Sequence, residues 1–139
     1  MENLNTSKST TFYSVGLSYK KADAEMRGKF SLDATAKIKL LEQAKRDGIE
    51  SLIVTSTCNR TEIFGFAQHP FQLIKLLCEN SQGTVEEFQK VAFVYKKQEA
   101  INHMFHVGTG LDSQILGDFE IISQLKIAFA ESKAARWYT

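Results

Sequence analysis

The stretch SLIVTSTCNRTEIFGFA, residues 51–67, decides the fold. Its two ends are rich in β-branched and aromatic residues, and they predict strands over residues 51–55 and 61–67. The short segment between them, from Ser56 to Arg60, is mostly polar. The sequence therefore predicts two strands that follow each other in the chain, joined by a tight connection that carries Cys58.

Two more strands and two helices flank this central pair. Residues 11–17 and 91–95 are short, aromatic and β-branched, and they predict a first and a fourth strand. Before the central pair, Asp33 is a predicted helix N-cap, and the apolar stripe that follows it stops before Asp47. After the pair, Pro70 suits the first turn of a second helix. The order β-α-β-β-α-β predicts an α+β fold of the ferredoxin-like, split βαβ type, which is an antiparallel sheet with helices on one face.

Two C-terminal helices are predicted after the fourth strand, over residues 99–107 and 121–135. The second has no Gly, Asn or Pro to end it, so we expect the chain to stop inside a helix. Residues 1–10 are polar and are predicted to be a disordered N-terminus. One domain over residues 11–139 is therefore expected.

Composition excludes several classes of protein. The 139 residues carry 17 Lys and Arg against 16 Asp and Glu, a net charge of +1, which is too balanced for binding nucleic acid mainly through its phosphates. No apolar run is long enough for a membrane span, and the N-terminus has no signal-peptide core. We therefore expect a cytoplasmic protein that has no membrane partner.

The cysteines are the first candidates for chemistry. Two of them, Cys58 and Cys78, are too few for a disulfide scaffold or a four-cysteine zinc site. The Arg60 cation close to Cys58 favours the thiolate, which is the nucleophilic form. From the residues alone, a reactive thiol and an inert turn residue both remain open for Cys58. Cys78 falls beside Leu77 on the packing side of a helix, which predicts an inert core thiol.

Three other polar features have plain structural interpretations. His103 is predicted on the solvated side of its helix, opposite Met104 and Phe105, where it is a surface residue or a general acid or base. His103 and His106 lack further ligands at known spacing, so we predict no metal site. The glycines near Ser113 follow a helix instead of a strand, which excludes a dinucleotide loop there.

The motif residues together resemble a known family. Ser56-Thr57-Cys58-Asn59-Arg60-Thr61-Glu62, His103 and Gly110-Leu111-Asp112-Ser113 with Gly117 closely resemble the N-terminal catalytic domain of the glutamyl-tRNA reductase family. The match spans nearly the whole chain, from Gly16-Leu17 to Gln124-Leu125-Lys126. The resemblance implies an enzyme that uses NADPH to reduce glutamyl-tRNA to glutamate 1-semialdehyde, which leads to 5-aminolevulinate and porphyrins in tetrapyrrole biosynthesis.

The same resemblance implies roles for the motif residues. Cys58 would attack the aminoacyl ester and hold glutamate as a thioester, which accepts hydride more readily than the ester. Thr57, Asn59 and Arg60 would bind the glutamyl group, and Arg60 suits its carboxylate. His103 would orient the ester or transfer a proton at the leaving ribose oxygen.

Further substrate contacts are implied near the C-terminus of the chain. The sequence departs there from the usual Gly-Glu-Pro-Gln pattern of the family, and serine precedes Gln124 in place of glycine. The implied substrate-binding residues are Ser113, Asp118, Phe119, Glu120 and Gln124.

Hydride transfer needs a dinucleotide-binding βαβ unit, and none fits in this sequence. The resemblance implies that the NADPH domain and a dimerising helical domain follow in the full-length enzyme, a homodimer that passes its product to glutamate-1-semialdehyde aminomutase. We therefore expect this chain to carry only the acyl-transfer half and to bind no cofactor. The alternative is a non-catalytic ferredoxin-like module for RNA binding or protein interaction, in which Cys58 is structural.

Overall fold

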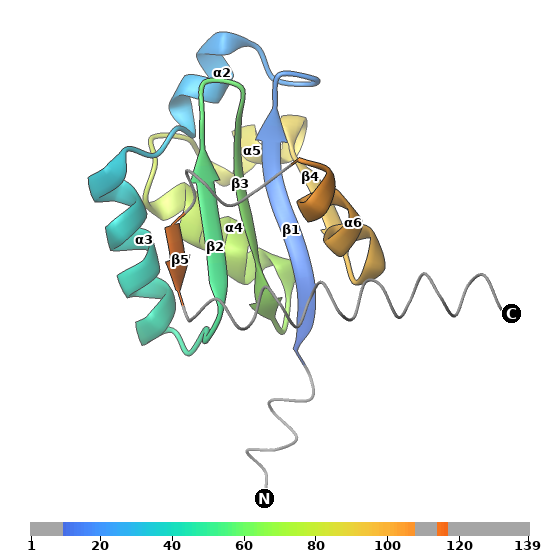
Figure 1. Ribbon diagram of the computed structural model, residues 1–139. Coiled ribbons are helices and arrows are strands. Elements are labelled where there is room, and N and C mark those ends of the chain that lie inside the picture. The colour runs from blue at the N-terminus through green and yellow to red at the C-terminus, as the bar shows by residue number, and fades with distance from the viewer. Residues whose placement is uncertain (1–9, 108–113, 117–139) are drawn as a thin grey trace, which may run out of the picture.

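The computed structural model describes residues 10–107 and 114–116. In these residues a five-stranded sheet has the order β4-β1-β3-β2-β5, and every neighbouring pair is antiparallel (Figure 1). The strands are β1 Thr11–Ser18, β2 Leu52–Ser56, β3 Arg60–Ala67, β4 Phe93–Lys96 and β5 Gln114–Leu116. The helices are α2 Ala24–Lys29, α3 Ala34–Arg46, α4 Pro70–Glu79, α5 Val85–Val91 and α6 Gln98–His106.

The α+β, ferredoxin-like prediction is confirmed. β3 lies between β1 and β2 and is antiparallel to both, so α3 connects two parallel strands that are one strand apart. In the same way β1 lies between β3 and β4, which α4 and α5 connect. This interleaving of two crossovers defines the split βαβ arrangement.

The predicted helix ends are also confirmed. The Asp33 carboxylate accepts a hydrogen bond from the backbone N–H of Ala36, 2.8 Å away, and so caps α3. After α3, Gly48 has a φ of +87°, which glycine adopts without steric cost. Pro70 opens α4, and His69 and Gln72 form a capping box around it.

The two faces of the sheet are covered by different helices. α3 and α4 pack on one face, where they bury Leu40, Leu73 and Leu77 against Val15 and Ile63. α6 packs on the opposite face and buries a separate cluster. The members of that cluster are Phe12, Ile53, Phe64, Ala100 and Met104. α6 thus packs on the face of the sheet that the helices of the two crossovers do not cover.

Two elements were not predicted from the sequence. β5 pairs with β2 through Ile115 and Ile53, but three residues are too short for an alternating pattern to stand out. The second unpredicted element is α5. Because this helix extends through Val91, the predicted strand over residues 91–95 begins only at Phe93. The predicted helix over residues 121–135 and most of the predicted disordered segment, residues 1–9, lie outside the described residues. Within residues 10–107 and 114–116, no helix has the length and apolar character needed to cross a bilayer.

Candidate functional site

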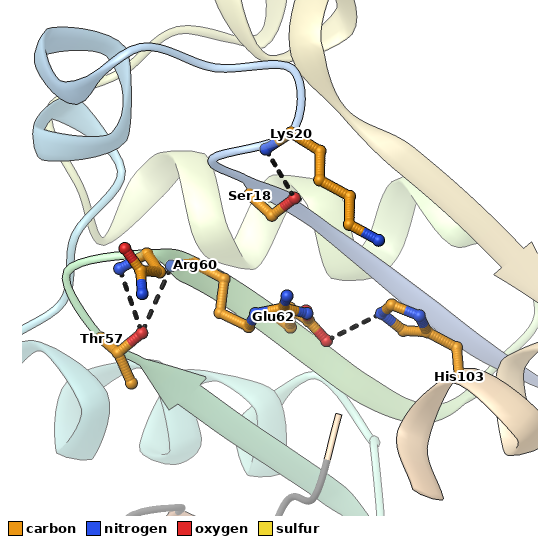
Figure 2. Close-up of polar contacts among 7 residues, drawn as sticks. Ser18, Lys20, Thr57, Arg60, Glu62 and His103 are labelled. Atoms are coloured by element: carbon orange, nitrogen blue, oxygen red, sulfur yellow. Dashed lines mark hydrogen bonds and ion pairs between the residues drawn. The ribbon is translucent and has the colours of Figure 1, made fainter. Parts of the chain in front are cut away.

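The connection between β2 and β3 is a tight hairpin that presents Cys58 to solvent. The Thr57 backbone N–H donates to the Arg60 carbonyl at 2.8 Å, which closes the turn. The Thr57 hydroxyl accepts from the backbone N–H groups of Asn59 at 3.2 Å and Arg60 at 3.3 Å (Figure 2). Thr57 therefore shapes the turn with its side chain, and the exposed Cys58 lies at its tip.

Two segments from the N-terminal part of the chain hold this turn from outside. The Arg27 Nε donates to the Cys58 carbonyl at 3.0 Å, and its other guanidinium arm donates to the Ala22 carbonyl at 2.7 Å. The Tyr19 N–H donates to the Asn59 carbonyl at 2.8 Å. Both carbonyls at the tip of the turn are therefore satisfied by residues close to β1 and α2.

A buried carboxylate lies next to the hairpin on the α6 face of the sheet. Glu62 in β3 is fully buried, and each of its oxygens has a cationic or polar partner. Oε1 accepts from an Arg60 guanidinium nitrogen at 2.7 Å, and Oε2 lies 3.1 Å from His103 Nε2 (Figure 2). Burying a carboxylate is costly unless it is paired and hydrogen-bonded, and this network supplies both conditions.

The prediction that His103 lies on the solvated side of its helix was wrong. Its side chain is only 18% exposed, because Ala100 and Met104 of α6 face the sheet and His103 shares that side. The imidazole ring packs against Phe93 and Tyr95, each with its ring centroid 4.9 Å away. The predicted apolar side was centred on the larger residues Met104 and Phe105, whereas the buried residues of the helix are Ala100 and Met104.

Arg60 extends along β3 to Glu62, so its guanidinium is bound within the protein (Figure 2). The cation whose side chain bonds directly to the Cys58 backbone is Arg27. Cys78 is half-buried, and burial raises the pKa of its thiol to about 11, with a smaller contribution from Glu79. This agrees with the expectation of an inert Cys78.

Gly16 allows β1 to approach the buried carboxylate closely. It lies opposite Glu62 in the register of β1 and β3. A Cβ atom at this position would overlap the Thr61 carbonyl oxygen and would come within 2.9 Å of Glu62 Cγ. The space that Glu62 occupies therefore depends on glycine in the neighbouring strand.

A cavity of about 210 Å³ opens beside this network. Its lining combines cations and polar groups with aromatic and aliphatic side chains. The lining residues are Ser18, Lys20, Lys21, Arg60, Val91, Ala92, Phe93, Tyr95, His103 and Val107. Arg60 and His103, two residues predicted from sequence, thus border one cavity.

The structure brings part of the predicted site together. Thr57, Cys58, Asn59 and Arg60 share one turn, and His103 reaches Arg60 through Glu62. The other predicted substrate-binding residues lie outside the described residues. They are Ser113, Asp118, Phe119, Glu120 and Gln124. In the part of the chain that is described, no three His, Cys, Asp or Glu side chains are grouped to hold a metal ion.

Sequence reasoning assigned no role to Glu62 or Arg27. A signal for Glu62 was present, because it is a charged residue in a strand and alternates with Phe64 and Phe66. No comparable signal marked Arg27, since its partner Cys58 lies 31 residues away in the chain.

The fold and the site together define an α+β domain of the ferredoxin-like class with a cysteine-bearing polar site at the β2–β3 turn. Comparison with known sequences identifies it further. The chain belongs to the family described as "Glutamyl-tRNAGlu reductase, N-terminal domain", whose model matches residues 15–139.

Individual relatives agree with this assignment. The chain is 79% identical over 134 residues to a glutamyl-tRNA reductase of Flavobacterium psychrophilum, covering 96% of this chain and 32% of the relative. It is 34% identical to the glutamyl-tRNA reductase of Acinetobacter baumannii, covering 91% of this chain and 30% of the relative. The solved structure of glutamyl-tRNA reductase from Methanopyrus kandleri matches with a TM-score of 0.54 and 26% identity, covering 90% of this chain and 28% of that one. The chain therefore spans about a third of the length of the curated relatives.

Proposed function

We propose that this chain performs the acyl-transfer step of a glutamyl-tRNA reductase, in the biosynthesis of tetrapyrroles. The observation that carries the proposal is the placement of Cys58. Its thiol is exposed at the tip of a turn whose carbonyls are held by Arg27 and Tyr19. A nucleophile on a fixed backbone loses little freedom when it meets a substrate carbonyl, which favours attack.

In the proposed reaction, the Cys58 thiolate attacks the ester carbonyl between glutamate and the terminal ribose of the tRNA. A carbon–sulfur bond forms, the carbon–oxygen bond to ribose breaks, and the ribose oxygen takes up a proton. The products are a glutamyl thioester on Cys58 and free tRNA. No electrons are exchanged with an external donor in this step.

In this proposal, the buried pair of Glu62 and His103 supplies the proton that the leaving ribose oxygen takes up. His103 is bound to Glu62 through Nε2, and the carboxylate orients the ring. We assign to His103 the proton that the ribose oxygen receives. Thr57, Asn59 and Arg60 are assigned to the glutamyl group, as are the five predicted residues between 113 and 124.

We infer that the described residues bind no NADPH. All neighbouring strands in the sheet are antiparallel, whereas a dinucleotide-binding crossover needs adjacent parallel strands with a glycine-rich turn before the helix. We therefore propose that reduction of the thioester, dimerisation and contact with the aminomutase belong to other parts of the full-length protein.

The test is to mix the chain with glutamyl-tRNA and to look for a glutamyl adduct by intact and peptide mass spectrometry. The adduct is expected on Cys58, is absent in Cys58→Ser and is retained in Cys78→Ser. Binding of tRNA with no adduct would contradict acyl transfer and favour a binding module. Formation of semialdehyde by this chain with NADPH would contradict the division of the two steps.

A further inference from the structure

Helix α6 begins at a strained residue. Its N-cap, Lys97, has a φ of +57° and a ψ of −129°, and no other non-glycine residue in the described ranges has a positive φ. Such a combination is typical of glycine and is costly for a residue that has a side chain. Two backbone hydrogen bonds hold it, because the Lys97 N–H donates to the Phe12 carbonyl at 2.8 Å and the Lys97 carbonyl accepts from the Ile101 N–H at 3.1 Å. The observed position of α6 therefore requires strain at Lys97.

α6 also has less support than the other described helices. A side chain caps the N-terminus of each of α2, α3, α4 and α5, whereas no side chain makes such a bond at the start of α6. α4 packs against both α3 and α5 on one face of the sheet. α6 lies on the opposite face, where it packs mainly on β1 and β4. Its position therefore depends mainly on its contacts with the sheet.

The surface of the sheet beneath α6 is partly polar. Ser14, Thr55 and Glu62 are buried on this face, since each lies two residues from a strand residue in the cluster that α6 buries. The Ser14 hydroxyl is buried without a hydrogen-bond partner among the described residues. An unpaired buried hydroxyl is unfavourable, because it has lost its bonds to water. Movement of α6 away from the sheet would relieve both this cost and the strain at Lys97.

The strained residue and the cavity lie at opposite ends of α6. Gly16 pairs with both Glu62 and Phe93, so β4 begins close to the buried carboxylate. Lys97 follows the other end of β4, and α6 runs back from there to His103, which reaches Glu62 and lines the cavity. A small rotation about the Lys97 backbone therefore moves the cavity end of α6 the most.

We propose that α6 is a lid on this cavity, which pivots at Lys97 and lifts from the sheet in a minor population of molecules. The apolar cluster beneath α6 and the bond between His103 and Glu62 favour the closed position. The strain at Lys97 and the unpaired Ser14 hydroxyl favour the open one. Because these contributions oppose each other, the open state is populated without unfolding of the sheet. This inference goes beyond the proposed function and does not depend on acyl transfer.

The experiment labels a thiol placed on either face of β1, in the chain with both native cysteines replaced by serine. Ser14→Cys lies beneath α6, and Val15→Cys is the matched control, since Val15 is equally buried on the opposite face. Iodoacetamide labelling under native conditions, followed by intact mass spectrometry, measures how often each site opens. We expect Ser14→Cys to be labelled faster than Val15→Cys by about tenfold or more.

The pivot is tested by glycine, which adopts a positive φ without strain. Lys97→Gly should slow the labelling of Ser14→Cys by about fivefold to tenfold relative to Lys97→Ala, because only glycine relieves the strain of the closed lid. Both variants remove the same positive charge. Lys96→Gly, one residue earlier in β4, is the control for glycine itself and should not slow the labelling.

A second pair of reporters keeps the test decisive if circular dichroism shows that Ser14→Cys does not fold. Met104→Cys on α6 and Leu77→Cys on α4 both place a smaller side chain at a buried position, and the first should be labelled faster. Equal labelling on the two faces would show that α6 opens only when the whole chain unfolds, which overturns the lid. Faster labelling beneath α6 that is the same in Lys97→Gly and Lys97→Ala would overturn the pivot at Lys97.

Discussion

Arg27 and Cys58 are joined by a hydrogen bond of 3.0 Å from the guanidinium Nε to the Cys58 carbonyl. The same guanidinium also binds the Ala22 carbonyl, so Arg27 links the segment before α2 to the tip of the β2–β3 turn. The backbone that carries the thiol is thus fixed from outside the hairpin. Arg27 acts as a positioning residue for Cys58.

Replacing Arg27 with alanine is expected to slow adduct formation from glutamyl-tRNA by about tenfold to a hundredfold, because a small misplacement of a reacting group is costly. Arg27→Lys should recover part of the rate, since lysine donates to one carbonyl instead of two. Stopped reactions analysed by mass spectrometry give both rates. Circular dichroism checks that the variants are folded, and a folded Arg27→Ala chain with the wild-type rate would contradict the positioning role.

Glu62 is expected to be needed for both stability and chemistry. Glu62→Ala leaves the partly buried Arg60 and His103 without their shared acceptor, and we expect the free energy of unfolding to fall by about 2–4 kcal/mol. Urea denaturation measures this change. Glu50→Ala, at an exposed position, is the control and should change stability by less than about 0.5 kcal/mol. Equal stability of the two variants would show that the network contributes nothing.

Gly16 and Gly28 form a matched pair for testing the close approach of β1 to β3. Gly16→Ala places a methyl group against backbone atoms of β3, and we expect a loss of about 1–3 kcal/mol. Gly28→Ala meets no atom within 4 Å and lies in α2, so it should be neutral or stabilising by up to about 1 kcal/mol. Thermal unfolding of both variants tests the contrast, which disappears if the strands separate easily.

The two thiols are expected to differ in how alkylation depends on pH. Because burial raises the pKa of Cys78 to about 11, its thiol stays protonated and unreactive near neutral pH. Its alkylation rate should rise steeply only in strongly alkaline solution, toward that pKa. Peptide mass spectrometry after timed iodoacetamide labelling follows each cysteine separately. The exposed Cys58 should be labelled first at neutral pH, and equally rapid labelling of Cys78 would contradict its burial.

Local signals in the sequence account for much of this fold. Asp33 and Pro70 mark helix starts by chemistry that acts within one turn, and the hairpin around Cys58 follows from two adjacent strand patterns. Local signals did not predict the orientation of His103, because it depends on how α6 packs on the sheet. Ala100 is small but fully buried there, which a pattern based on large apolar residues underestimates.

In the candidate site, too, some features were predictable from the sequence and others depend on the assembled fold. Thr57 to Arg60 are contiguous, so their shared turn was predictable from the chain. Glu62 and Arg27 act through partners 41 and 31 residues away, and such contacts exist only once the sheet and α2 are assembled. β5 is a further case, since its three residues are defined by pairing with β2 and not by a pattern of their own.

The outermost strands of the sheet have a consequence for behaviour at high concentration. β4 and β5 are the edges, and they contain only four and three residues. Exposed strand edges are templates on which a second molecule can add a strand, and short or charged edges resist this. β4 also ends in the exposed Lys96, which repels an identical edge. The described part of the sheet therefore offers little backbone for intermolecular β-pairing, and this favours resistance to aggregation.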